Sequence, residues 1–286
     1  MTDWKAHRAH REAVVRDEGQ WIGLADENGD PLMDLPTAVK MEAPATRLTP
    51  GSLELTLQVR DGSGVVHPVV SELVADRLGM VEPGGVFVPA DGPARLVVVE
   101  RPGERRAYKV KFAVAAGDGV SPQTLTIHAL EVLNVLWELP CPTSRLSWRR
   151  DGYKTLERDP VKPFERPWEI AQLTFGAQAD GFSDEGPAEA TIRQIITNSI
   201  DAVAEHEGWE IPHVVVDQAA TGRPSPHVVI QRTDDFIGDT VSEPALLSGV
   251  NITADWWLPG DPPVKGMDVN VPVIVIRVAQ SEGVEP

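Results

Sequence analysis

Hydrophobic and polar residues alternate along several stretches of this chain, which is the pattern of strands that bury one face. The clearest case is SLELTLQVR (52–60), where Leu53, Leu55, Leu57 and Val59 share one face. Strands are also predicted at QWIGLA, PLMDL, RLVVVE, RRAYKVKFAVAA and QTLTIHALEVL, and the last two of these alternate in the same way. The turn signal DENGDP lies between the first two and predicts a hairpin.

One of these strands places four large apolar residues on a single face. In RRAYKVKFAVAA, alternation sets Tyr108, Val110, Phe112 and Val114 opposite the lysines. A short helix is expected at PVVSELVADRLG, between two of the strands. Residues 20–139 are therefore predicted to form a first β-barrel module, a twisted antiparallel sheet or barrel crossed by one helix.

A helical period appears at two further places. Residues 4–17 predict a basic docking helix that ends near Gly19, so residues 1–19 form a separate N-terminal segment. A longer helix is predicted to begin at Pro187 and to end at Gly208. Its apolar stripe consists of Ile192, Ile195, Ile196, Ser199, Ile200 and Val203.

Residues 140–180 interrupt both patterns. Five prolines precede Trp168, and residues 141–168 carry seven Lys and Arg against four Asp and Glu, a net charge of +3. We expect a proline-rich basic arm that packs on a neighbouring subunit, because it has too many aromatic side chains to leave in water. They are Trp148, Tyr153, Phe164 and Trp168.

After the arm, residues 181–286 combine the long helix with strands at IPHVVVD, SPHVVIQR, GVNITADWWL and VNVPVIVIRV. This segment is predicted to be a second β module. The abundance of turn residues, 24 Gly and 25 Pro, suits short strands. The expected fold class is mainly β with inserted helices, an α+β protein.

Charge and cysteine content limit the possible partners. The formal net charge is −17, and residues 180–217 hold nine Asp and Glu against Arg193 alone. Proteins that bind the phosphate backbone of nucleic acids concentrate Lys and Arg on their surface, so this acidic chain is expected to repel nucleic acid. A single cysteine, Cys141, and a charged N-terminus favour folding in a reducing cytoplasm without membrane insertion.

Candidate catalytic and metal-binding residues are few. His7 and His10 lie three residues apart on the first predicted helix, but neighbouring Lys and Arg would repel a cation. Cys141 stands between two prolines, which does not suit an activated nucleophile. Asp159 and the pair Asp234–Asp235 are candidates for general acid–base catalysis, yet no recognised sequence motif places two of these carboxylates at a catalytic separation. We expect no catalytic residue, no cofactor and no metal.

The adjacent indoles in GVNITADWWLPGDPPVKG raise a separate question, because neighbouring side chains of a strand point to opposite faces. Trp256 shares its face with Ile252, Ala254 and Leu258 and is expected in the core. Trp257 is then exposed in the monomer and is predicted to anchor a contact between subunits. The alternative is that the following loop, 259–263, folds back over it.

Three stretches resemble the hub (minor tail) proteins of long-tailed phages of actinobacteria. They are WIGLADENGDPLMDLPTAVKMEAPATRLTPGSLELTL, GDGVSPQTLTIHALEVLNVLWELPCPTSRL and GVNITADWWLPGDPPVKG. The resemblance implies a relative of baseplate hubs, which are trimers whose subunits each contribute two tube-like antiparallel β-barrel modules. It brings no active-site residues with it.

The resemblance thus implies a structural protein at the virion tail tip, assembled in the host cytoplasm. Its implied partners are itself, in a ring that is a trimer, the distal tail protein, the tape-measure protein and other tail-tip proteins. DNA would only pass through the lumen. Two other functions stay open from the sequence: a distal tail ring protein, and a carbohydrate-binding adsorption module in which Trp257 stacks on sugar.

Overall fold

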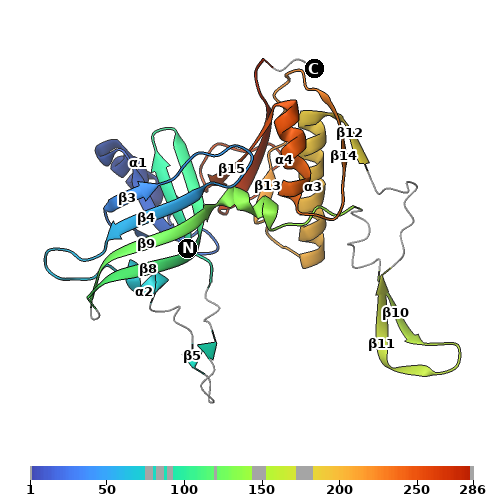
Figure 1. Ribbon diagram of the computed structural model, residues 1–286, viewed down its shortest axis with the longest axis horizontal. Coiled ribbons are helices and arrows are strands. Elements are labelled where there is room, and N and C mark those ends of the chain that lie inside the picture. The colour runs from blue at the N-terminus through green and yellow to red at the C-terminus, as the bar shows by residue number, and fades with distance from the viewer. Residues whose placement is uncertain are drawn as a thin grey trace. The chain divides into compact units, whose positions relative to one another are not determined.

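The computed structural model describes residues 2–74, 80–81, 87–88, 93–118, 121–143, 153–171 and 183–283 (Figure 1). The chain forms two compact units, and neither is a continuous piece of sequence. Unit 1 consists of Met1–Asn134, Ala254–Pro262 and Asn270–Ile274. Unit 2 consists of Val135–Thr253, Pro263–Val269 and Val275–Pro286. Two short segments from late in the sequence, 254–262 and 270–274, thus belong to the unit that consists mainly of the first 134 residues.

Unit 1 contains a seven-stranded antiparallel sheet in the order β2-β1-β7-β8-β9-β4-β3. Its strands are β1 (Trp21–Ala25), β2 (Pro31–Asp34), β3 (Ala38–Glu42), β4 (Ser52–Gln58), β7 (Leu96–Arg101), β8 (Glu104–Asp118) and β9 (Ser121–Glu131). The sheet contributes to two buried apolar clusters, one around Leu55 of β4 and a second that includes Trp21, Leu96 and Trp256. Two further short strands, β5 (Met80–Val81) and β6 (Phe87–Val88), pair with each other.

The sheet is a curled half-barrel and not a closed barrel. Of the two predicted forms, a twisted antiparallel sheet or a barrel, the antiparallel sheet is therefore the one observed, and the barrel is wrong for this unit. The two edge strands, β2 and β3, are joined by only three residues, 35–37. The backbone N–H of Leu35 donates to Ile22 at 2.9 Å, and the carbonyl of Thr37 accepts from Gln58. Each end of this connection therefore bonds to its own neighbouring strand, and no ladder among the described strands joins β2 to β3.

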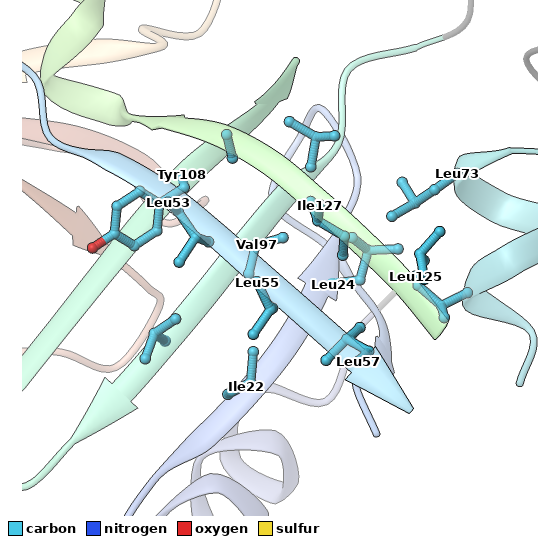
Figure 2. Packing of buried hydrophobic residues seen from close by; sticks show 14 of the residues in the cluster. Ile22, Leu24, Leu53, Leu55, Leu57, Leu73, Val97, Tyr108, Leu125 and Ile127 are labelled. Atoms are coloured by element: carbon cyan, nitrogen blue, oxygen red, sulfur yellow. The ribbon is translucent and has the colours of Figure 1, made fainter. Parts of the chain in front are cut away.

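The apolar face of β4 forms the centre of the core, as predicted (Figure 2). Leu53, Leu55, Leu57 and Val59 are at most 1% exposed. They pack with apolar residues of β1, β7, β8, β9 and the short helix α2 (Val69–Leu73), namely Ile22, Leu24, Val97, Val99, Tyr108, Val110, Leu125, Ile127, Val69 and Leu73. The alternation of one strand thus correctly predicts the inner face of the sheet.

A β-bulge changes the faces of β8. Val110 pairs with Ala129, whereas Phe112 pairs with His128, so Lys111 is the extra residue. One unpaired residue moves every later side chain to the other face. Phe112 and Val114 are consequently exposed, at 56% and 51%, although simple alternation placed them beside Tyr108.

Helix α1 (Trp4–Glu18) follows the prediction closely. The side chain of Asp3 caps it by accepting from the N–H of Ala6, and Gly19 ends it in the left-handed conformation at φ 85°. Only the start of the predicted helix at PVVSELVADRLG, α2, lies within the described residues. A six-residue 3-10 helix (Val132–Trp137) spans the boundary between the two units.

Unit 2 is not a second barrel in its described part. Two helices, α3 (Ala188–Glu207) and α4 (Ile237–Ser248), contact each other and accompany three small sheets. The sheets are β13-β16-β15 (Val214–Val216, Val273–Gln280, Val250–Trp257), β12-β14 (Ser183–Pro187, His227–Gln231) and β10-β11 (Tyr153–Arg158, Pro163–Ala171). Residues 254–257 of β15 and 273–274 of β16 belong to unit 1. Helix α3 begins after Pro187 and ends at Gly208, as predicted, while α4 was not expected.

Candidate functional site

The paired tryptophans both lie in the interior. Trp256 is 5% and Trp257 9% exposed. The indole N–H of Trp257 donates to the carbonyl oxygen of Pro262 at 2.9 Å, so the loop folds back over the ring. The expected exposure of Trp257 is therefore wrong, because the Pro/Gly loop covers the face that alternation assigned to solvent. Its proposed role between subunits stays a prediction.

The same turn carries a carboxylate that the sequence analysis did not single out. Asp261 accepts from the backbone N–H of Leu258 at 2.8 Å and from the guanidinium of Arg8 at 2.7 Å. It also pairs with Arg105. Burial alone would raise the pKa of Asp261, but the hydrogen bonds of Arg105 and Leu258 lower it below its ordinary value. Asp261 is thus held ionised against the sheet of unit 1.

Arg105 connects this turn to a second carboxylate. Its Nε donates to Glu100 at 2.8 Å, and an Nη donates to the carbonyl of Trp256 at 3.2 Å. Glu100 also pairs with Arg11, which is 1% exposed. Burial, followed by the nearby charge of Arg105, lowers the pKa of Arg11. We call Arg8, Arg11, Glu100, Arg105 and Asp261 the charge cluster of unit 1.

The charge cluster changes the interpretation of α1. Arg8 and Arg11, two of the charges that predicted a docking helix, form ion pairs inside unit 1. These pairs fasten the helix to the strand pair β7–β8 and to the turn after β15. The prediction that the helix offers these two cations to a partner is therefore wrong.

The two histidines of α1 do not point to one ligand site. The ring of His7 lies edge-on to Trp4 and Trp21, with centroid separations of 5.8 and 5.5 Å. Burial, and then the charge of Arg11, lowers the pKa of His7 to about 4. His10 instead contacts Asp34, with Nε2 and Oδ2 2.5 Å apart. Within the described ranges, no group of three His, Cys, Asp or Glu is arranged to hold a metal ion.

The remaining candidate chemistry serves local structure. Cys141 is fully buried, with the hydroxyl of Ser199 3.4 Å from its sulfur. Asp234, at φ 64°, accepts from the backbone N–H and the hydroxyl of Thr143 at 2.6 and 2.7 Å. Asp159 accepts from two N–H groups of the turn that follows it. The structure does not bring these carboxylates together as an acid–base pair.

Unit 2 has a buried polar network at the start of α3. Glu189, 5% exposed, accepts from Arg193 at 2.5 Å and from the hydroxyl and the N–H of Thr221 at 2.5 and 2.8 Å. Arg193 also donates to the carbonyl of Val278 on β16. Burial would raise the pKa of Glu189, but the bonds from Thr221 and Arg193 lower it. The network ties the loop after β13 to the helix.

The predicted arm contains a β-hairpin, which is more regular than the extended arm expected from its prolines. Strands β10 and β11 pair antiparallel, with Leu156 opposite Trp168. The rings of Phe164 and Trp168 stack, with centroids 5.3 Å apart and planes at 15°. Tyr153 is the first residue of β10, and Trp148 lies outside the described residues.

Similarity to known proteins is limited to solved structures. No protein-family model and no curated protein matches the sequence. Among solved structures, the 43 kDa tail protein of prophage MuSo2 from Shewanella oneidensis is 14% identical, with a TM-score of 0.36 over 90% of this chain and 53% of that one. The tail protein from Neisseria meningitidis MC58 is 10% identical, with a TM-score of 0.37 over 90% and 50%. The chain thus spans about half the length of each.

Proposed function

We propose that this chain is a structural protein of a bacteriophage tail and that it forms part of the tail-tip hub. In this role it continues and closes the tail tube, assembles as a ring of three copies and anchors neighbouring tip proteins. It performs no catalysis itself and carries no cofactor. The distal tail protein and the tape-measure protein are its proposed neighbours.

The observation that carries this proposal is where the resembling sequence stretches lie in the fold. Residues 21–57 build β1 to β4, and residues 117–146 include β9 and the 3-10 helix. Residues 249–266 build β15 and the turn of Asp261. The resemblance to tail hub proteins therefore rests on framework residues that hold strands and turns together, as expected for a structural protein.

The acidic composition supports passage of DNA without retention. With a net charge of −17, a lumen wall that exposes carboxylates would repel phosphate. We propose that acidic side chains of this chain line the channel of the assembled ring.

Purified virions of the encoding phage test the proposed role. Mass spectrometry should detect this chain in the particles, and immunogold labelling should place it at the end of the tail distant from the head. Absence from particles, or labelling of the head, would refute the function. A purified chain that hydrolyses peptidoglycan, with activity lost on one Asp or His substitution, would contradict the non-catalytic part.

A further inference from the structure

A small pocket lies where the curled sheet of unit 1 brings three of its strands together. Edge strand β3 is separated from β8 by β9 and β4 in the sheet order, yet β3, β7 and β8 line one hollow of about 60 Å³. We call this hollow the β3 pocket. Its lining residues are Met41 of β3, Ala43 just after that strand, Val99 and Arg101 of β7, and Glu104, Arg106 and Tyr108 of β8.

The apolar lining residues limit the shape and the size of the β3 pocket. Met41 and Ala43 pack against the core around Leu55, and Val99 belongs to that core. Their side chains offer a ligand contact with methyl or methylene groups and no hydrogen bond. The volume is about that of two water molecules in the liquid, at about 30 Å³ each, so the pocket holds a group of only a few heavy atoms.

Of the charged lining residues, Arg101 is the one without an ionic partner in the described part of the chain. Arg106 donates through Nε to Glu104 at 2.6 Å, so the charges of these two residues offset each other. Arg101 is exposed, and its Nε donates to the neutral side-chain oxygen of Gln20 at 3.3 Å. Its two Nη groups thus remain available to an anion. A planar guanidinium binds a carboxylate through two parallel hydrogen bonds.

Tyr108 supplies a second donor. It is 1% exposed, and Figure 2 shows its hydroxyl pointing away from the apolar cluster. The guanidinium of Arg106, which can only donate, hydrogen-bonds to the hydroxyl oxygen. Burial raises the pKa of Tyr108 although Arg106 opposes the shift, so the hydroxyl keeps its proton at neutral pH. That proton has no acceptor among the described residues and is available to a ligand.

We propose that the β3 pocket binds a carboxylate carried on a short apolar stem, with the guanidinium of Arg101 and the hydroxyl of Tyr108 as its donors. The apolar residues contact the stem, and the lining residues, two Arg against one Glu, carry a net charge of +1 that matches a single carboxylate. A sulfate or phosphate carries more charge and would set part of it against Glu104. The carboxylate comes from the chain end of a neighbouring protein or from one of its Glu side chains. This inference goes beyond the proposed tail role and does not depend on it.

Methyl NMR of the full chain, isotope-labelled at its methionine methyl groups, tests the site. Met41 lines the pocket, whereas Met33 packs against the same core without lining it and is the internal control. N-acetyl-leucine, a mimic of a chain end, should shift the Met41 signal saturably and leave the Met33 signal in place. N-acetyl-leucinamide, which lacks the charge, should give no saturable shift. N-acetylglutamate α-amide presents a side-chain carboxylate instead, and the tighter of the two acids identifies the source.

Two variants and a matched control test the donors. Arg101→Gln should weaken binding of N-acetyl-leucine at least about tenfold, because hydrogen bonds between two charged groups are lost. Tyr108→Phe keeps the ring in the core and should weaken binding about threefold or more. Arg158→Gln removes the same charge from an exposed position on β10 in unit 2 and should change binding less than about twofold. Melting temperatures verify that each variant is folded.

Several results would overturn the inference. They are the absence of a saturable Met41 shift with both acids, an equal shift with the amide, and an unchanged affinity of Arg101→Gln. Sulfate that binds as tightly as N-acetyl-leucine would show that the pocket selects charge alone, and would overturn it as well. None of these results bears on the tail role, which the experiment on virions tests separately.

Discussion

Replacing each of the paired tryptophans by phenylalanine should give unequal losses of stability. Both rings are buried, so Trp→Phe leaves a small cavity at either position, which costs about 1 kcal/mol. At Trp257 the substitution also removes the donor to the carbonyl of Pro262, and because Pro262 is exposed, water can replace the donor, so the lost bond costs about 0.5–1.5 kcal/mol. At Trp256 the indole N–H is buried and has no acceptor among the described residues, so its removal relieves a cost of about 1–3 kcal/mol.

Because the lost bond at Trp257 and the relieved cost at Trp256 add, Trp257→Phe should be about 1.5–4.5 kcal/mol less stable than Trp256→Phe. Urea denaturation followed by far-UV circular dichroism measures the difference, provided that the slope of each transition stays equal to that of wild type. If Trp256→Phe is as destabilising as Trp257→Phe, or more so, the loop of Pro262 does not depend on the indole bond. A Trp257→Ala variant that assembles poorly but unfolds like wild type would restore the role between subunits.

Three further predictions concern the buried charges. Arg105→Met should destabilise the chain by about 3 kcal/mol or more in urea, because Glu100 and Asp261 lose their shared partner; Arg105→Lys should recover only part, since one ammonium cannot reproduce the guanidinium bonds. The lowered pKa of Glu189 contributes stability that is present above its ordinary pKa of 4.5 and is lost as the pH falls through the lower pKa of the folded state. The melting temperature of Glu189→Gln should therefore depend less on pH over that range than the melting temperature of wild type. If the variant loses as much stability in acid as wild type does, this reasoning is wrong. His7 binds its proton near pH 4 when folded and near 6.5 when unfolded, so stability should decline as the pH falls from 6.5 to 4; a His7→Phe variant that keeps the whole decline would show that another group causes it.

Local patterns predicted those parts of the fold that depend on neighbours in sequence. The inner face of β4, the Gly19 end of α1 and the Gly208 end of α3 all follow from residues within a few positions of one another. The bulge at Lys111 could not be predicted in this way, because it depends on the register of β9. Helix α4 escaped notice because Pro244 lies inside it and no side chain caps its start.

At the candidate site, too, features that depend on sequence neighbours were predicted and features that depend on distant residues were missed. The sequence singled out Trp256 and Trp257 because they are adjacent, and alternation then placed Trp257 on the wrong side. Asp261 looked like an ordinary turn residue, since its partners Arg8 and Arg105 lie 253 and 156 residues away in the chain. The hairpin of the arm was missed because prolines are poor strand formers, although only one of its strands carries them between its ends.

The split of unit 1 along the sequence has a consequence for synthesis on the ribosome. Its sheet is made from residues up to Asn134, but Trp256 and Asp261 belong to a segment that starts at Ala254. At about 5–20 residues per second, that segment emerges roughly 6–24 s later. During this interval Arg105 lacks one of its two carboxylates and Trp21 lacks an apolar neighbour. Nascent unit 1 should therefore resist protease only after its last segment, 270–274, has left the ribosome, which arrested chains that end before 254 and well beyond 274 would reveal.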